Sequence, residues 1–294
     1  MRLFLLLLLA LPAFATAGTT VVTTLHPLAL LTAELAAGQV EVKTMMSPNA
    51  TPHHYQMKPS ERRMLAQADL IIWVGPNMEV FLQRLLGQQA LATKSLALSE
   101  AVSEPEHERP TNDVRADHDH TGSDPHLWLD PGLAPQLAAA IADRLSQLPG
   151  VDAAIVQQRL THFRNQLEAS NRKLRQQFAR LQQVDLFTYH TAFERFADFY
   201  GIPLAGTLTV TPERNPGAQH LAAVRDQLKA AQNACVLTEP QFSSDWWRNL
   251  VPGKQLQVVT WDPLAAHIKA APGSYVQFLE DLGQRVMGCL NGSS

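Results

Sequence analysis

Three histidines lie at positions from which they could together bind one metal ion. His53 comes after the alternating segment 39–46, and His190 directly follows the expected strand 185–189. His126 is the first residue of the stretch HLWLDP. Neutral imidazole is a preferred ligand of Zn²⁺, which takes four ligands in tetrahedral geometry. Three imidazoles with a carboxylate or a water as the fourth donor would therefore make a zinc site.

Asp262, in the segment VTWDPLAA, also follows an expected strand and is the candidate for the fourth, oxygen ligand. Each of these four residues alone has a simpler explanation, because polar residues are common where a strand ends. An Asp before a proline, as in Asp262-Pro263, readily begins a turn. The scattered spacing by itself leaves both interpretations open.

The elements that must position these residues alternate between strand and helix in both halves of the chain. Strands are expected at 20–25, 39–46, 69–75, 185–189, 204–210, 234–239 and 256–261. Helices are expected at 27–37, 59–68, 78–86, 133–148, 192–200, 218–231 and 274–289, with Ser60 a plausible cap for the second. Such alternation predicts α/β lobes, each with a parallel sheet and helices on both faces.

A long helix is expected between the two halves. Residues 151–183 have helical apolar spacing and contain no Gly or Pro, so the helix could run about 45 Å. We therefore predict an N-terminal lobe at 18–148, a linking helix at 149–183 and a C-terminal lobe at 184–294. Ligands bind at the carboxyl ends of parallel strands, which predicts a shared cleft between the lobes.

Residues 1–17 have the pattern of a cleavable signal peptide. Arg2 precedes the apolar stretch 3–12, and Ala15-Thr16-Ala17 is the small-x-small pattern of a cleavage site. No Cys lies directly after the apolar stretch to carry a lipid, and no later stretch is long and apolar enough for a membrane span. We expect an exported protein that is not embedded in the membrane.

Composition and charge narrow the class of protein. The chain is 46% hydrophobic and 17% charged, which is typical of a globular protein, and its net charge of −3 argues against nucleic-acid binding. Two cysteines, Cys235 and Cys289, lie in the expected C-terminal lobe. In an oxidising compartment a single pair favours one disulfide, and the alternative is two buried free thiols.

The polar segment 103–125 (SEPEHERPTNDVRADHDHTGSDP) interrupts the alternation and is expected to be a flexible surface loop. It could hold a weak second metal site made by His107, His118 and His120, with Asp117, Asp119 and Asp124 nearby. A solvated acidic loop with incidental histidines explains the segment equally well.

Several segments together resemble one family over nearly the whole chain after residue 17. They are TPHHYQMKPSE, ADLIIWVGPNMEVFL, DPHLWLDP, TYHTAFERFADFYG, TVTPERNPGAQHL, TEPQF and WDPLA. The chain resembles the zinc-specific solute-binding proteins of bacterial ABC importers, the ZnuA-like group of cluster A-I receptors. The resemblance implies two α/β lobes joined by a rigid long helix, with the metal between them.

The resemblance also implies the ligands. Three histidines match the family's ligand positions: His53, His126 and His190. Asp262 matches an Asp that some members use as a fourth ligand and others leave beside the site. Pro52 stands where some zinc receptors have a Glu, and His54 where relatives commonly have an Asp. Asp262 or a water is left as the fourth donor, and the cysteines match a pair found in relatives.

The implied function is a monomeric periplasmic receptor that delivers Zn²⁺ to a membrane ABC permease. A manganese receptor is the first alternative, but manganese suits oxygen ligands, so His190 favours zinc. A zinc hydrolase is a second, with Glu239 as its candidate base besides Asp262, although HExxH and GxSxG motifs are absent. A periplasmic zinc buffer without a permease is a third.

Overall fold

The computed structural model describes residues 18–103, 124–179, 181–209, 216–242 and 245–290. The expected signal peptide and most of the polar segment 103–125, including His107, His118 and His120, lie outside the described residues. Among the described residues, no helix has the length and apolar character needed to cross a membrane.

The first lobe is built on a parallel sheet with the order β2-β1-β3-β4. Its strands are β1 (Thr20–Thr23), β2 (Glu41–Thr44), β3 (Leu70–Trp73) and β4 (Ser95–Ala97). All four residues of β3 are buried, as a strand covered on both faces requires. The three strands expected here are present but shorter, and β4, with three residues, was not expected.

Helices surround this sheet. They are α1 (His26–Ala36), α2 (Pro59–Gln67), α3 (Val80–Leu86), α4 (Gln89–Ala92), α5 (Leu98–Ala101) and α6 (Ala134–Leu145). The prediction that Ser60 caps α2 was wrong, because the helix begins at Pro59 and Lys58 is the cap position. Proline suits the first helical position, where its missing N–H is not needed. The Glu61 carboxylate instead accepts the Lys58 N–H at 2.7 Å.

The second lobe repeats this topology with the order β6-β5-β7-β8, again all parallel. Its strands are β5 (Asp185–Thr188), β6 (Gly206–Thr207), β7 (Ala234–Thr238) and β8 (Gln257–Thr260). Its helices are α8 (Glu194–Tyr200), α9 (Ala218–Ala230), α10 (Asp245–Arg248) and α11 (Ser274–Met287). In both sheets the chain reverses its strand order at the first strand, so a crevice is expected where the first and third strands end.

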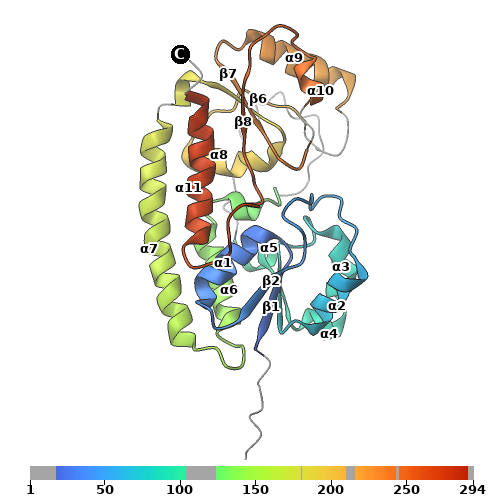
Figure 1. The fold of residues 1–294 in the computed structure, drawn as a ribbon, viewed down its shortest axis with the longest axis vertical. Helices are drawn as coiled ribbons and strands as arrows, with labels where there is room; N and C mark the ends of the chain where they lie inside the picture. Colours follow the sequence, from blue (N-terminus) through green and yellow to red (C-terminus); the bar gives the residue numbers. More distant parts are fainter. Residues whose placement is uncertain (1–17, 104–123, 180, 210–215, 243–244, 291–294) are drawn as a thin grey trace, which may run out of the picture.

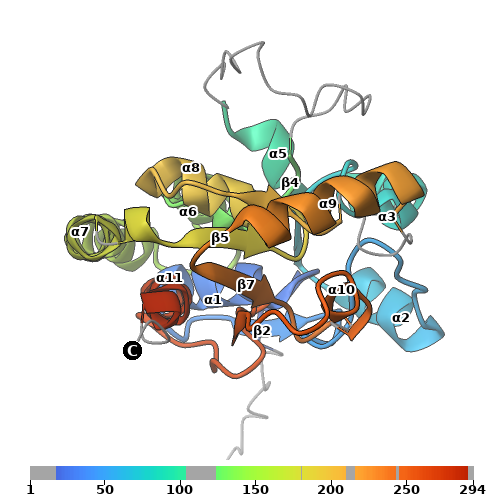
Figure 2. The ribbon, with the colours of Figure 1, turned by 90° about the horizontal axis from the view of Figure 1, so that it is seen from above.

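The helix α7 (Ala153–Phe178) runs along both lobes, with α11 beside it (Figures 1 and 2). Its 26 residues span about 39 Å. Asp152 caps it by accepting the Ala154 N–H at 2.8 Å. The expected long helix is confirmed, but it ends at Phe178 and is followed by a 3₁₀ turn at Leu181–Gln183.

One apolar core connects the lobes through these helices, and a second, smaller one lies within the second lobe. The first includes Leu31 of α1, Phe163 of α7 and Phe278 of α11, all essentially without solvent exposure. The predicted disulfide is confirmed: Cys235 of β7 is bonded to Cys289, in the turn after α11. The disulfide thus attaches β7 covalently to the turn that follows α11.

Candidate metal centre

The structure brings His53, His126 and His190 together. The Nε2 atoms of His126 and His53 are 3.3 Å apart, and those of His190 and His126 are 3.4 Å apart. Ligand atoms of all three lie within 4.8 Å of one another. Across the described ranges, no other group of three or more His, Cys, Asp or Glu side chains meets this criterion.

These separations have the size that a tetrahedral zinc ion requires. Two nitrogens each about 2.05 Å from Zn²⁺ at a tetrahedral angle are about 3.3–3.4 Å apart. Without a cation, lone pairs or N–H groups that converge on one point repel each other. The cluster therefore has the spacing of one face of a zinc coordination shell.

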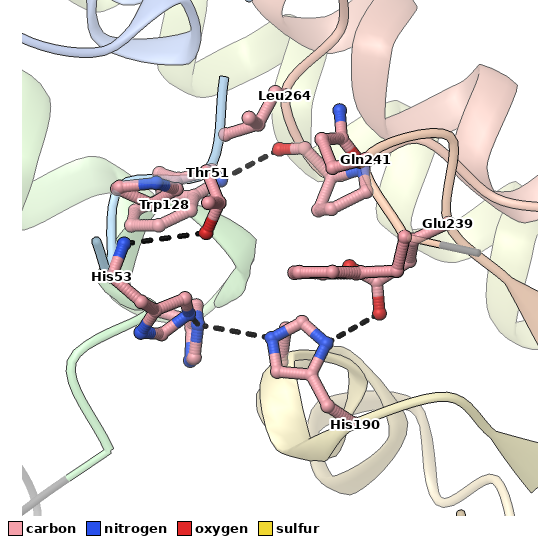
Figure 3. Close-up of a pocket in the computed structure, with 12 residues that line it drawn as sticks. Thr51, His53, Trp128, His190, Glu239, Gln241 and Leu264 are labelled. Atoms are coloured by element: carbon pink, nitrogen blue, oxygen red, sulfur yellow. Dashed lines mark hydrogen bonds and ion pairs between the residues drawn. The ribbon is translucent and has the colours of Figure 1, made fainter. Parts of the chain in front are cut away.

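The two lobes contribute different ligands. His53 lies in the segment after β2, and His126 precedes the 3₁₀ turn Leu127–Leu129, so both come from the first lobe. His190 follows β5 in the second lobe and precedes the 3₁₀ turn Thr191–Phe193. Figure 3 shows His53 and His190 approaching each other across the pocket. A metal bound here would link the lobes.

Carboxylates fix the orientation of two imidazoles. Nδ1 of His126 lies 2.7 Å from Asp124 Oδ1, and Nδ1 of His190 lies 2.5 Å from Glu239 Oε1 (Figure 3 shows the second pair). A carboxylate only accepts hydrogen bonds, so each Nδ1 carries the proton. The Nε2 lone pair of each ring is then directed at the cluster, as in carboxylate–histidine–zinc arrangements.

Asp124 is held as an anion by its neighbours. Burial raises the pKa of this carboxyl, but His126 and the Arg195 guanidinium outweigh burial and hold the pKa below its usual value. Arg195, on α8 of the second lobe, also donates from Nε to the Asp124 main-chain oxygen at 2.9 Å. The support of His126 therefore includes a contact between the lobes.

His53 is kept neutral by its surroundings. Burial, together with the neighbouring His126 and His190, lowers the pKa of this imidazole to about 3. At neutral pH its ring therefore offers a lone pair without competition from a proton. The adjacent His54 is exposed and is not part of the cluster.

Asp262 is not part of the three-histidine group. Its Oδ1 accepts from Gln241 Nε2 and from the Leu264 N–H, both at 3.0 Å. Its Oδ2 accepts the Ala266 N–H at 2.7 Å. The carboxylate thus closes a turn, and its role as a fourth ligand remains a prediction.

Sequence reasoning did not identify Glu239 as the hydrogen-bond partner of His190. Glu239 was considered as a base for an enzyme, whereas its carboxylate faces Nδ1 of His190. It follows β7, the neighbour of β5 in the sheet, so the crevice between these strands brings it to His190. The strand order would have identified Glu239 as a partner of His190, but no local sequence pattern shows that order.

Two α/β lobes on one long helix, with converging imidazoles between them, define a two-lobed solute-binding receptor with a metal-type site. The family model "Zinc-uptake complex component A periplasmic" matches residues 21–287. The chain therefore belongs to this family.

Individual proteins of known name are similar to this chain in sequence or in structure. A "High-affinity zinc uptake system protein ZnuA" of Yersinia pestis is 34% identical, with 97% of this chain and 95% of that protein covered. A crystal structure of ZnuA matches with a TM-score of 0.75 at 23% identity, covering 92% of this chain and 98% of that one. The "periplasmic zinc binding protein" TroA of Treponema pallidum matches with a TM-score of 0.74 at 22% identity, covering 93% and 99%. The two structures confirm the predicted fold class.

Proposed function

We propose that this protein captures Zn²⁺ with His53, His126 and His190 and delivers it to a membrane ABC permease. The observation that supports this most directly is the short distance from His126 Nε2 to two other Nε2 atoms. It is 3.3 Å to that of His53 in the same lobe and 3.4 Å to that of His190 in the other lobe. The names of the curated relatives point to the same role. The protein acts in the periplasm as a monomer, after removal of residues 1–17.

Zinc is favoured over manganese by the donor atoms. Manganese suits carboxylate, carbonyl and water oxygens, whereas imidazole suits zinc. The two carboxylates nearest the imidazoles, Asp124 and Glu239, are directed at Nδ1 atoms rather than at the point where the Nε2 atoms converge. Asp262 or a water supplies the fourth donor, and His107, His118 and His120 form at most an accessory site.

A receptor is also favoured over a hydrolase. Glu239, the candidate base, is engaged with His190 and is 5% exposed. A general base must instead reach the metal-bound water or the substrate. The geometry of Glu239 suits an imidazole-orienting role in capture of the ion.

The test is a calorimetric zinc titration of residues 18–294. We expect one tight zinc per chain. His126→Ala and His190→Ala should each weaken binding more than the ~10- to 100-fold that loss of an outer-shell partner costs. The matched control is His54→Ala, an exposed neighbour that should leave the affinity unchanged.

A variant lacking residues 103–123 locates the tight site. Tight binding that survives this deletion supports the histidine cluster, and the polar segment is then accessory. Loss of tight binding with the segment would contradict the cluster as the main site.

Delivery to a permease needs a cellular measurement. In a chelated medium, cells that lack this receptor should accumulate zinc more slowly, and the wild-type gene but not the His190→Ala variant should restore the rate. A zinc buffer without a permease would leave the uptake rate unchanged.

A further inference from the structure

Gln241 lies where the two lobes and the histidine cluster meet. It follows β7 in the second lobe and lines the same pocket as the three histidines (Figure 3). Its Nε2 donates to the main-chain oxygen of Pro48 at 3.3 Å, and Pro48 belongs to the segment of the first lobe that leads to His53. The same nitrogen donates to Asp262 Oδ1 at 3.0 Å.

These bonds determine which way the amide faces. A main-chain oxygen and a carboxylate only accept hydrogen bonds, so the NH₂ group must face Pro48 and Asp262. The carbonyl oxygen Oε1 then faces away from both. It is buried, and no donor among the residues that the structure describes forms a hydrogen bond with it.

An unpartnered buried acceptor is unfavourable. Such an atom is therefore expected to gain a donor in the functional state. Two carboxylates near this oxygen already accept hydrogen bonds: Glu239 Oε1 faces His190 Nδ1, and the neighbouring Asp262 accepts from three N–H groups. Gln241 Oε1 is therefore a buried acceptor without a donor, on a residue that lines the pocket.

We propose that Gln241 Oε1 accepts a hydrogen bond from a water that occupies the fourth coordination position of the bound zinc. The inference rests on the proposed function, in which three imidazoles fill the other positions. A water on Zn²⁺ is acidified and is a strong donor, which suits a buried neutral acceptor. Because Nε2 joins the His53 segment to the second lobe, Gln241 connects the fourth position with the closure of the lobes.

Two substitutions separate the oxygen from the nitrogen. Gln241→Met keeps the length of the side chain and removes both hydrogen-bonding groups. Gln241→Glu keeps an acceptor oxygen and loses the NH₂ donor. We would measure zinc affinity and, with Co²⁺ as the probe, the visible absorption, which depends on ligand number and geometry. Thermal unfolding of the metal-free variants reports folding, and Gln241→Leu replaces the Met variant if that variant fails to fold.

We expect Gln241→Met to bind zinc ~10- to 100-fold more weakly, with an altered Co²⁺ spectrum, because an outer-shell partner is lost. Gln241→Glu should keep the affinity within ~10-fold and retain the wild-type spectrum, since a water acceptor remains. This pair of results would support the inference.

Equal losses in both variants would assign the effect to the Nε2 bonds and overturn the inference. Unchanged affinity and spectrum in Gln241→Met would overturn it as well. Both results differ from failure of the proposed function, in which the wild-type protein itself would bind no tight zinc.

Discussion

At the scale of single residues, the centre depends on carboxylates that do not face the metal position. Asp124 and Glu239 each accept the Nδ1 proton of a histidine, so Nε2 is the ring nitrogen that carries the lone pair. Such partners fix the tautomer and the ring orientation and raise the basicity of the ligand. The precision of the cluster therefore comes from residues that neighbour the ligands in sequence or in the sheet.

Replacing Glu239 tests this directly. Glu239→Gln keeps the shape but removes the charge that favours Nδ1–H on His190, so we expect zinc affinity to fall ~10-fold. Competition titration against a chelator of known affinity measures the change. Glu168→Gln, on the exposed surface of α7, is the control and should leave the affinity as it is. Equal affinities for the Glu239 variant and the wild type would contradict the role.

At the scale of elements, the ends of the first and third strands carry different kinds of residues in the two sheets. In the second lobe, His190 and Glu239 follow the first and third strands. In the first lobe, the corresponding place holds Glu79, which is fully buried and accepts from Thr24 Oγ1 and from the Val74 and Gly75 N–H groups. Glu79 therefore ties the ends of β1 and β3 together where the other lobe carries a ligand.

Glu79 should make stability depend on pH. Burial raises its pKa from 4.5 to about 7, and the hydrogen bonds only partly oppose this. As pH rises, the unfolded chain loses this proton near pH 4.5 and the folded chain near pH 7. The contribution is therefore fully present below pH 4.5 and falls by up to about 3 kcal/mol by pH 7.

The measurement is the free energy of unfolding of wild type and Glu79→Gln between pH 4 and pH 8. The difference between the two proteins should shift against the wild type across this interval and then level off. A difference that stays constant with pH would show that Glu79 does not titrate in this way. The constant cost of the substitution itself does not affect the comparison.

The sequence predicted elements well where local patterns were strong. The apolar run of β3 and the uninterrupted helical spacing of α7 identified both elements. β4 was missed because three residues carry no period, and the strand expected at 204–210 is reduced to Gly206–Thr207. The pairing of β5 with β7, which brings Glu239 to His190, depends on contacts between distant segments and is not visible as a local pattern.

At the scale of the whole molecule, the lobes are joined in two ways. One is the continuous apolar core through α1, α7 and α11, which contains none of the three histidines. The histidine cluster, together with the bonds from Arg195 to Asp124 and from Gln241 to Pro48, joins the lobes at the cleft. Zinc would strengthen only the second connection, because its ligands come from both lobes.

Zinc should therefore order the cleft without altering the spine. Amide hydrogen exchange, measured with and without zinc, should slow in residues 47–58 and 239–242, which the bound ion holds together. Exchange in the interior of α7 should stay unchanged, since opening that helix already requires breaking the shared core. His190→Ala, which removes the ligand from the second lobe, should abolish the protection at 239–242. Zinc-dependent changes along α7 would instead mean that capture bends the linking helix and moves the lobes as rigid bodies.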